Sequence, residues 1–377
     1  MANNKNLEIE SLRAFAILLV MFRHLHYSLP ISVTDYPLLL QGTWSGVDLF
    51  FVISGFVITK SLFNNYNKWK QGSMSFGRML GAFYVRRVFR LLPVCLVVLG
   101  GYTLASAAFN TANNAFPKTA AIINELPYVL LYVYNIAIPF LTTSVLGWHW
   151  SLSLEEQFYL LYPLILFLIP KTKHKLFFFA TVIMLVTFLV RPWYAANIHA
   201  EKLWPLFTTP TYLRCDLLMA GCFLAFIKLP PLQLNSVGLK FLFLISLFMV
   251  ATTGGWMGFR PVFLYPVILL FAALLVFMAA YNKGAIPVNK FFTWVGARSY
   301  VLYLLDIPML HFTNECFYRI TGHTTKAAVF LQSSISLIIS TLLCFAMAEL
   351  LHRFVEMPCI AFGKKYAQRM ENKASVV

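Results

Sequence analysis

Residues 6–29 read NLEIESLRAFAILLVMFRHLHYSL, an apolar stretch of membrane-spanning length that also carries arginine and histidine. An α-helix rises about 1.5 Å per residue, so about 20 apolar residues cross the hydrocarbon core of a bilayer. Similar apolar runs recur as far as Leu350. Lipid offers no hydrogen-bond partners to the backbone, and runs that cross it must therefore be helical. The sequence predicts an all-α integral membrane protein.

Composition supports the same fold class. Of 377 residues, 59% are apolar and 12% are charged, whereas about a quarter of the residues in a soluble globular chain are charged. We predict a polytopic helical bundle of about ten transmembrane helices. Their ranges are 12–30, 44–63, 86–108, 151–169, 176–190, 211–228, 240–256, 262–281, 294–312 and 327–350.

The basic residues predict how these helices are oriented. Lysine and arginine number 22 in the loops and helix ends on one side of the membrane and 7 on the other, and Arg23 lies within the first helix. Because such residues accumulate on the cytoplasmic side, both termini are predicted to be cytoplasmic. The net charge of +16 then reflects topology and contact with membrane lipids, and nucleic acid is not expected as a partner.

The segment 120–141 tests the number of spans. It is apolar enough to suggest an eleventh helix, but a further span would move Lys171, Lys173 and Lys175 to the outer side and invert every later loop. Proline and polar residues within the segment also suit a membrane helix poorly. We therefore expect a surface-lying or re-entrant segment on the outer side, with eleven spans as the alternative.

We expect one membrane-embedded domain over residues 1–377. No polar stretch in the sequence is long enough to form a separate soluble domain, and the tail 351–377 is short and predicted to be cytoplasmic. The first apolar run is expected to be a retained helix, because no small-residue cleavage site follows it. The six cysteines are scattered without metal or redox spacing, so no metal is expected.

The first helix carries the clearest candidate site. Arg13 and His24 are eleven residues apart, about three helical turns, which places them on one face with roughly 16 Å between them. Ionisable residues inside a membrane are costly and indicate function by default. A neutral imidazole is a general base near neutral pH. The structural alternatives are a membrane anchor for Arg13 and an interhelical hydrogen bond for His24.

Three carboxylates in other spans are further candidates. Asp48, in GTWSGVDLFFVISGFVIT (42–59), lies at a depth comparable to His24 and is expected to orient the imidazole. Glu155 and Glu156 enter the helix that begins in WHWSLSLEEQ (148–157). The helix dipole favours carboxylates in a first turn, but two of them entering a membrane helix favour a functional role over capping alone.

Arg86, Arg87 and Arg90 form a basic cluster in FYVRRVFRLLP (83–93). One interpretation is anchoring at the cytoplasmic face with contact to anionic lipids. The other is a phosphate site, because forked guanidinium groups suit the phosphates of a nucleotide such as coenzyme A. The residues alone leave both open.

Seven stretches make the chain similar to a known family. In chain order they are RAFAILLVMFRH (13–24), GVDLFFVISGF (46–56), RRVFRLLP (86–93), WSLSLEEQFYLLYP (150–163), RCDLLMAG (214–221), SYVLYL (299–304) and FVEMP (354–358). With these landmarks in family order, the chain resembles the acyltransferase-3 family of membrane O-acyltransferases.

This resemblance implies acyl transfer across the membrane. Acyl-CoA would bind on the cytoplasmic side, and the acyl group, usually acetyl, would reach a sugar hydroxyl on the outer side. Arg13 and His24 match residues that are essential in the family, and Arg86, Arg87 and Arg90 match a functional basic motif. With no appended hydrolase-like domain, the chain resembles stand-alone enzymes of the cell inner membrane. Those enzymes modify O-antigen in lipopolysaccharide, exopolysaccharide or other surface glycans.

The resulting hypothesis assigns a role to each candidate. His24 is the catalytic base, with an acyl-histidine intermediate left open, and Asp48 orients it. Glu155 or Glu156 lies on the acceptor side, where it binds sugar hydroxyls or relays a proton, and the acceptor is a glycan or lipid-linked oligosaccharide. The donor is acetyl-CoA or another acyl-CoA. The expected catalytic residues are His24, Arg13, Asp48, Glu155 and Glu156. The expected donor-binding residues are Arg13, Arg86, Arg87 and Arg90.

Two positions depart from the family pattern. Many relatives have a histidine where this chain has Asp306, so a histidine-dependent role does not carry over, and a carboxylate at this depth needs a partner. Arg23 replaces a residue that is usually apolar or aromatic. The rival functions are a glycan or lipid-linked sugar transporter and a non-catalytic membrane sensor or assembly factor. No internal repeat or paired interrupted helices favour the transporter.

Overall fold

The computed structural model describes residues 6–31, 41–109, 116–197, 208–227, 229–256 and 261–372. Within these ranges every regular element is helical and no strand occurs. The prediction of an all-α protein is confirmed for this part of the chain.

Each of the ten predicted ranges overlaps a helix. These helices are α1 (Leu7–Arg23), α3 (Gly46–Lys70), α4 (Phe76–Phe109), α7 (Trp150–Leu168), α8 (Thr172–Leu185), α11 (Thr211–Phe226), α12 (Ser236–Trp256), α13 (Pro261–Tyr281), α15 (Ser299–Thr321) and α16 (Phe330–Leu351). The remaining helices are α5 (Thr119–Leu130), α6 (Tyr134–Ala137), α9 (Arg191–Asn197), α14 (Lys290–Ala297) and α17 (Met357–Asn372). A π-helical turn, Val186–Val190, joins α8 to α9, and another, His352–Glu356, joins α16 to α17.

Helix length and composition make the chain a multi-pass membrane protein. Among the described residues, six helical stretches are long and apolar enough to cross a membrane, or seven if the bent pair α5–α6 counts as one span. The six are Thr43–Phe63, Phe76–Phe109, Thr172–Asn197, Ser236–Gly254, Phe263–Tyr281 and Phe330–Asn372. Four further helices lack either the length or the apolar composition of such a span: α1, α7, α11 and α15. These four carry many of the polar residues described below.

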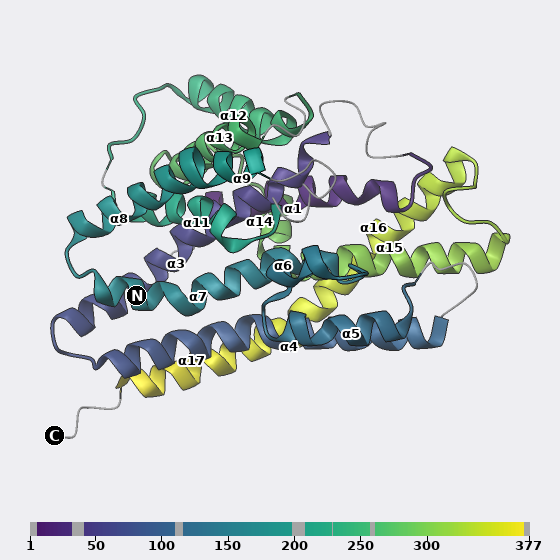
Figure 1. Ribbon diagram of the computed structural model, residues 1–377, viewed down its shortest axis with the longest axis horizontal. Helices are drawn as coiled ribbons and strands as arrows, with labels where there is room; N and C mark the ends of the chain where they lie inside the picture. Colours follow the sequence, from purple (N-terminus) through teal and green to yellow (C-terminus); the bar gives the residue numbers. More distant parts are fainter. Residues whose placement is uncertain are drawn as a thin grey trace.

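The core forms around α3. This helix contacts α1, α4, α7, α11 and α13, and its Leu49, Phe51 and Val52 are fully buried. Its closest neighbour is α11, because a Cβ added at Gly55 would lie 2.0 Å from the Leu218 carbonyl oxygen. Only glycine permits this backbone approach between the two helices. In Figure 1, α12 and α13 lie above this central layer, and α4, α5 and α17 lie below it.

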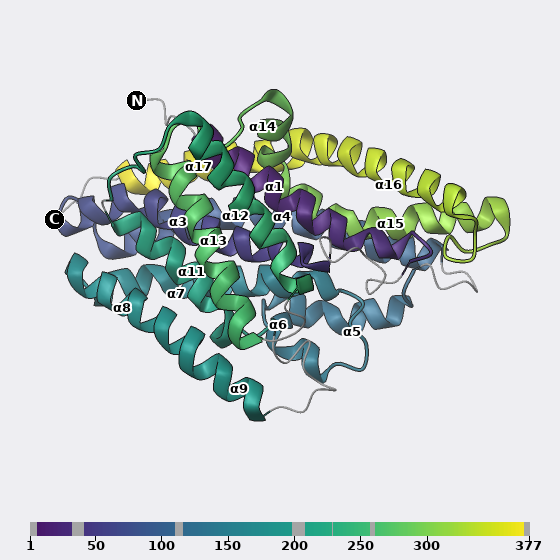
Figure 2. The same ribbon diagram turned by 90° about the horizontal axis from the view of Figure 1, so that it is seen from above.

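The first described helix begins and the last one ends toward the same end of the molecule (Figure 2). Both figures show α1 beginning and α17 ending at the end where the turn 71–75 joins α3 to α4, while the turn 322–329 between α15 and α16 lies at the other end (Figures 1 and 2). Contacts of Glu371 agree with this placement, because its carboxylate accepts hydrogen bonds from Asn65 on α3 (2.7 Å) and Arg86 on α4 (2.5 Å). The helices thus bring the predicted cytoplasmic segments together.

The segment 120–141 is broken into two helices. α5 and the stretch Tyr134–Phe140 are bent by 119° relative to each other. Tyr132, at the break, has a φ of 54°, a left-handed conformation that residues other than glycine rarely adopt. Its carbonyl oxygen accepts a hydrogen bond from Gln157 on α7 (2.7 Å). The geometry fits both a broken span and a re-entrant loop, so it is compatible with the expected re-entrant segment and with the alternative of an additional span.

Candidate active site

A cavity with polar and aromatic lining lies among α1, α3, α7, α11 and α15, and we call it the histidine cavity. Its volume is about 490 Å³, and His24 lies in its wall. Aromatic side chains form much of the rest of this wall. They are Tyr27, Trp44, Trp148, Trp150 and Tyr303.

His24 is held by a carboxylate from a distant helix. α1 ends at Arg23, and His24 begins a 3₁₀ turn that runs to Tyr27. The His24 Nδ1 atom lies 2.6 Å from Asp306 Oδ2 on α15. An ionised carboxylate only accepts hydrogen bonds, so Nδ1 carries the proton and Nε2 keeps its lone pair. This arrangement leaves Nε2 as the nitrogen that is able to accept a proton.

One face of α15 lines the histidine cavity. Tyr303, Ile307 and His311 are each four residues apart and all border it. His311 Nδ1 lies 2.7 Å from the Tyr102 hydroxyl of α4, which fixes this second imidazole against a neighbouring helix. Residues at this spacing share one side of a helix, so α15 contributes a continuous strip of one phenol, one aliphatic and one imidazole side chain.

The structure corrects the predicted role of Asp48. Its buried carboxylate binds Arg214 of α11, and it is Asp306 that contacts His24. A permanent cation in the same buried layer is the stronger partner for a desolvated carboxylate. Arg214 itself borders the histidine cavity. A second buried pair, Arg191 with Asp216 (2.9 Å), lies in the same region.

A second, smaller cavity gathers three arginines, and we call it the arginine cavity. Its volume is about 80 Å³, and Arg13, Arg87, Arg90 and Glu155 line it. Glu155 accepts hydrogen bonds from Ser54 (2.9 Å) and Tyr159 (2.6 Å). The Arg87 guanidinium lies over the Tyr159 ring, 5.1 Å from its centroid. Arg13 also pairs with Glu10 of its own helix at 3.2 Å.

The structure separates Arg86 from the other two arginines of its cluster. Arg86 forms an ion pair with Glu371 of α17 at 2.5 Å, and it is absent from the wall of the arginine cavity. It lies about one helical turn before Arg90, close enough to the end of the bundle for α17 to reach it. Of the four predicted donor-binding residues, Arg13, Arg87 and Arg90 line the arginine cavity and Arg86 does not.

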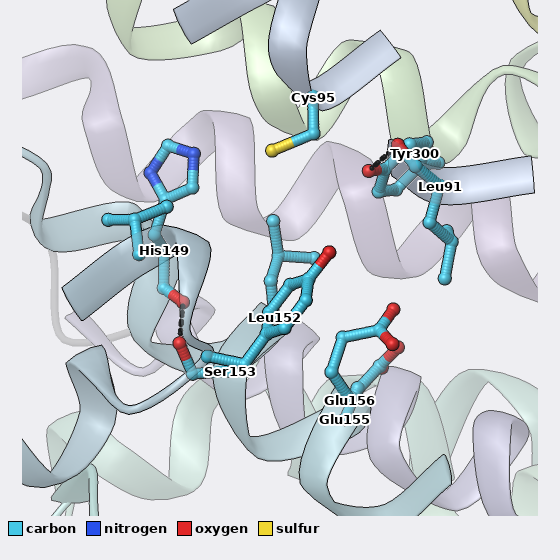
Figure 3. Close-up of a pocket in the computed structure, with 10 residues that line it drawn as sticks. Leu91, Cys95, His149, Leu152, Ser153, Glu155, Glu156 and Tyr300 are labelled. Carbon is cyan, nitrogen blue, oxygen red and sulfur yellow. Dashed lines mark hydrogen bonds between the residues drawn. The ribbon is translucent and has the colours of Figure 1, made fainter. Parts of the chain in front are cut away.

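The two glutamates lie elsewhere than expected. Glu155 faces the arginine cavity, and both glutamates line a third cavity of about 10 Å³. Figure 3 shows Glu156 in this cavity with Cys95, His149 and Tyr300 around it. α7 places Trp150 at the histidine cavity, and Glu155 follows five residues later, about 7.5 Å deeper along the helix. Neither glutamate is therefore in position to contact an acceptor beside His24.

Several site residues were not predicted from the sequence. Asp306 was recognised as needing a partner, but its partner was unknown. The spacing of Tyr303, Ile307 and His311 on one helix face is the signal that would have found the α15 strip. Arg214 does carry a sequence signal, because an arginine within an apolar run is costly in a membrane. Trp44 carries no such local signal, because its contact with the cavity depends on how the helices pack. In the described part of the chain, no group of three or more histidine, cysteine or carboxylate side chains has an arrangement that would hold a metal ion.

Comparison with known proteins identifies the class of this multi-pass membrane protein. The acyltransferase domain model of the acyltransferase-3 family matches residues 6–349, so the chain belongs to this family. The resemblance inferred from the seven landmarks is confirmed.

The chain is similar to three bacterial proteins over most of its own length. It is 29% identical to the O-acetyltransferase OatA of Staphylococcus aureus strain MRSA252, covering 97% of this chain and 59% of that protein. It is 27% identical to the peptidoglycan O-acetyltransferase OatA of Listeria monocytogenes, covering 93% of this chain and 55% of that protein. It is also 30% identical to a protein of S. aureus strain COL that is provisionally named an O-acetyltransferase, covering 93% and 56%.

The chain spans little more than half the length of these curated relatives. No solved structure matches it significantly.

Proposed function

We propose that this protein transfers an acyl group, most simply acetyl, from acyl-CoA to a hydroxyl of a cell-surface glycan. The observation that carries the proposal is the His24–Asp306 pair in an aromatic-walled cavity, with a separate arginine cavity beside it. A general base and an anion-binding site are the two requirements of transfer from a phosphate-bearing thioester to a neutral hydroxyl.

The chemistry needs only the groups described. The hydroxyl oxygen of the acceptor attacks the thioester carbonyl carbon while its proton passes to His24 Nε2. The carbon–sulfur bond then breaks, and the departing CoA thiolate takes that proton from the imidazolium. Asp306 stabilises the imidazolium between these steps through its contact with Nδ1. The products are the glycan ester and free CoA, and His24 returns to its neutral form.

Arg13, Arg87 and Arg90 are the proposed donor-binding residues. Guanidinium groups bind phosphates through charge-assisted and bidentate hydrogen bonds, and all three border one cavity. The cavity is too small for a whole nucleotide, so the phosphates would bind at its mouth and the pantetheine arm would enter it. Acetyl-CoA is the proposed donor, since the relatives are named O-acetyltransferases.

The aromatic walls of the histidine cavity support a carbohydrate acceptor. Sugar rings present C–H groups that pack on aromatic faces, while their hydroxyls bind polar side chains at the rim. Trp44, Trp148 and Trp150 provide the apolar faces, and Arg23 and His26 provide polar groups. One relative is named for action on peptidoglycan. Peptidoglycan, O-antigen or another surface glycan, free or lipid-linked, is the acceptor class that we propose.

We propose ten membrane crossings with both termini in the cytoplasm. This topology follows the 22-to-7 division of lysine and arginine, and it puts Arg13 near the cytoplasmic face with His24 deeper toward the outer side. The cell inner membrane is the proposed location. The donor would thus approach from the cytoplasm and the acceptor from outside.

The test uses the full chain in lipid nanodiscs. Release of free CoA thiol from acetyl-CoA is followed with and without isolated surface glycans, and the glycans are analysed by mass spectrometry. We expect thiol release that depends on glycan, a mass gain of one acetyl group, and loss of both in His24→Asn. Glycan movement across the membrane without thioester cleavage would instead support the transporter alternative.

A further inference from the structure

The histidine cavity and the arginine cavity share part of their walls. Val47 of α3 and Tyr303 of α15 border both cavities, while His24 lines only the larger one and Arg13 only the smaller one. Ser151 lines the arginine cavity, and its neighbour Trp150 lines the histidine cavity. The beginnings of α3, α7 and α15 therefore form the partition between the two chambers.

Tyr303 is tied across this partition by two hydrogen bonds. Its hydroxyl donates to the Trp148 carbonyl oxygen at 2.6 Å. The single hydroxyl proton is then used, so Ser151 Oγ, at 2.7 Å, donates to the Tyr303 oxygen. Both partners belong to the turn that opens α7, so the aromatic ring bridges α15 and α7 beside Val47. Val47 is only 8% exposed, so its side chain is packed within this partition.

The proposed reaction requires a passage through this partition. The phosphates of the donor have their candidate partners in the arginine cavity, and the base that activates the acceptor lies in the histidine cavity. The nucleotide is charged and bulky, whereas the pantetheine arm is a narrow, neutral chain that ends in the thioester. Only this end is suited to pass between Val47 and Tyr303 and reach His24.

We propose that Tyr303 and Val47 form a gate between the donor and acceptor chambers, which the thioester end of acyl-CoA opens by displacing Tyr303. This inference rests on the proposed function. In the closed state, the two hydrogen bonds of Tyr303 keep water and the acceptor away from the donor side. Tyr303 is a positioning residue that couples thioester cleavage to the presence of an acceptor.

Two substitutions test the gate in opposite directions. Val47→Trp fills the passage, and we expect CoA affinity to stay near the wild-type value while glycan acetylation falls about 100-fold, because even small misplacement of reacting groups costs that much. Tyr303→Phe keeps the ring but loses both hydrogen bonds. We expect hydrolysis of acetyl-CoA without an acceptor to rise about tenfold. The two hydrogen bonds stabilise only the closed state, so their loss increases the population of the open state.

The matched control for Val47→Trp is Val97→Trp on α4. Val97 is 46% exposed and borders neither chamber, so the same substitution there should leave both activities unchanged. Normal acetylation by a folded Val47→Trp protein would show that the donor does not pass between Val47 and Tyr303. An unchanged ratio of hydrolysis to transfer in Tyr303→Phe would show that Tyr303 does not close the passage.

A thiol-labelling measurement tests the gate separately from the proposed enzymatic function. It can be made even if Val47→Trp does not fold. Val47→Cys, with the six native cysteines replaced, is treated with a thiol reagent in the presence and absence of acetyl-CoA. If the donor occupies the passage, modification of Cys at this position slows in proportion to donor binding, whether or not turnover occurs. Binding of acetyl-CoA without any protection would overturn the gate while leaving the donor site intact.

Discussion

The contact between His24 and Asp306 decides which nitrogen is available for chemistry. With Nδ1 facing the carboxylate at 2.6 Å, the imidazole presents Nε2 to the histidine cavity and gains a stabilising negative charge when it is protonated. Asp48 lies in a neighbouring layer and neutralises Arg214 instead. The two carboxylates therefore have different partners, an imidazole for Asp306 and a guanidinium for Asp48.

We predict that Asp306→Asn lowers kcat for glycan acetylation by about 10²-fold, within the range that general base catalysis contributes. The amide keeps the shape but not the charge that stabilises the imidazolium. The KM for acetyl-CoA should change little, because Asp306 does not border the arginine cavity. Steady-state kinetics in nanodiscs make the measurement, and near-normal kcat in the folded variant would contradict the role.

The corresponding change at Asp48 serves as the comparison. Asp48→Asn leaves the Arg214 guanidinium buried without a charged partner, and breaking a buried ion pair in this way costs about 3–5 kcal/mol. We expect a lower melting temperature, with kcat per folded molecule retained. If Asp48→Asn instead lost turnover with unchanged stability, the sequence-based expectation that Asp48 orients His24 would regain support.

The three clustered arginines should differ in their effect on donor binding. We predict that Arg90→Ala weakens acetyl-CoA binding. Arg90→Lys should restore only part of the affinity, because lysine lacks the forked guanidinium group. Arg86→Ala should leave affinity close to normal, since Arg86 pairs with Glu371 outside the arginine cavity. Calorimetry with CoA measures both. Equal losses at the two positions would mean that the cluster acts as one phosphate site.

Whether a residue's neighbours could be predicted from the sequence depended on how close the residues lie in the chain. Arg13 and His24 are eleven residues apart, so their spacing alone predicted a common helix face, but α1 ends at Arg23 and the two residues line different cavities. The Asp306 contact joins residues 282 positions apart, and such a pairing follows only from the packing of α1 against α15. The same holds for Arg86, whose partner Glu371 lies in a tail that was predicted only to be cytoplasmic.

At the scale of helices, polarity marks the elements that carry the site. α1, α7, α11 and α15 are the segments that fall short of the length or apolarity of a simple membrane span, and each contributes to a chamber wall. Helices whose faces line a cavity keep polar residues that lipid-facing helices lack. The ten predicted ranges all overlapped helices because apolar periodicity and helix ends are local properties. The break in 120–141 is not local, since it depends on contacts with other segments.

Glu125 organises the bent element. Its buried carboxylate accepts hydrogen bonds from Tyr134 (2.8 Å), Thr143 (2.7 Å) and the backbone N–H groups of Val145 (3.0 Å) and Leu146 (2.9 Å). These bonds tie α5 to the chain that leads into the turn before α7. Four acceptor positions are used at once, which explains why a charged residue occupies this apolar segment.

We predict that Glu125→Gln destabilises the protein by about 1–3 kcal/mol, because one oxygen becomes an amide donor and leaves buried donors unpaired. Glycan acetylation should show a raised KM for the acceptor, since Val145 and the neighbouring Trp148 line the histidine cavity. Acetyl-CoA affinity should stay constant. Thermal melting and kinetics with varied glycan make the test. A loss confined to donor binding would contradict this assignment of the element to the acceptor side.

The whole molecule has two unlike ends. The start of α1, the turn between α3 and α4 and the end of α17 gather at one end, and the turn between α15 and α16 lies at the other (Figures 1 and 2). The basic residues of the loops divide 22 to 7 between the predicted sides. The path of the chain and the distribution of lysine and arginine therefore both place the segments predicted to be cytoplasmic at one end. The proposed donor and acceptor chambers follow one another along the same axis.

The last prediction concerns which end faces the cytoplasm. Ser73→Cys and Ala327→Cys place single thiols on exposed turns at opposite ends of the molecule, in a background without the six native cysteines. Because lysine and arginine accumulate on the cytoplasmic side, a membrane-impermeant maleimide added to intact cells should label position 327 and leave position 73 unlabelled until the membrane is permeabilised. The opposite pattern would invert the proposed topology. Arg13, Arg87 and Arg90 would then face away from the cytoplasmic pool of acyl-CoA, and the direction of transfer would have to be reversed. Labelling of both positions in intact cells would place the two turns on one side, which the arrangement of α3, α4, α15 and α16 does not allow for a chain spanning the membrane.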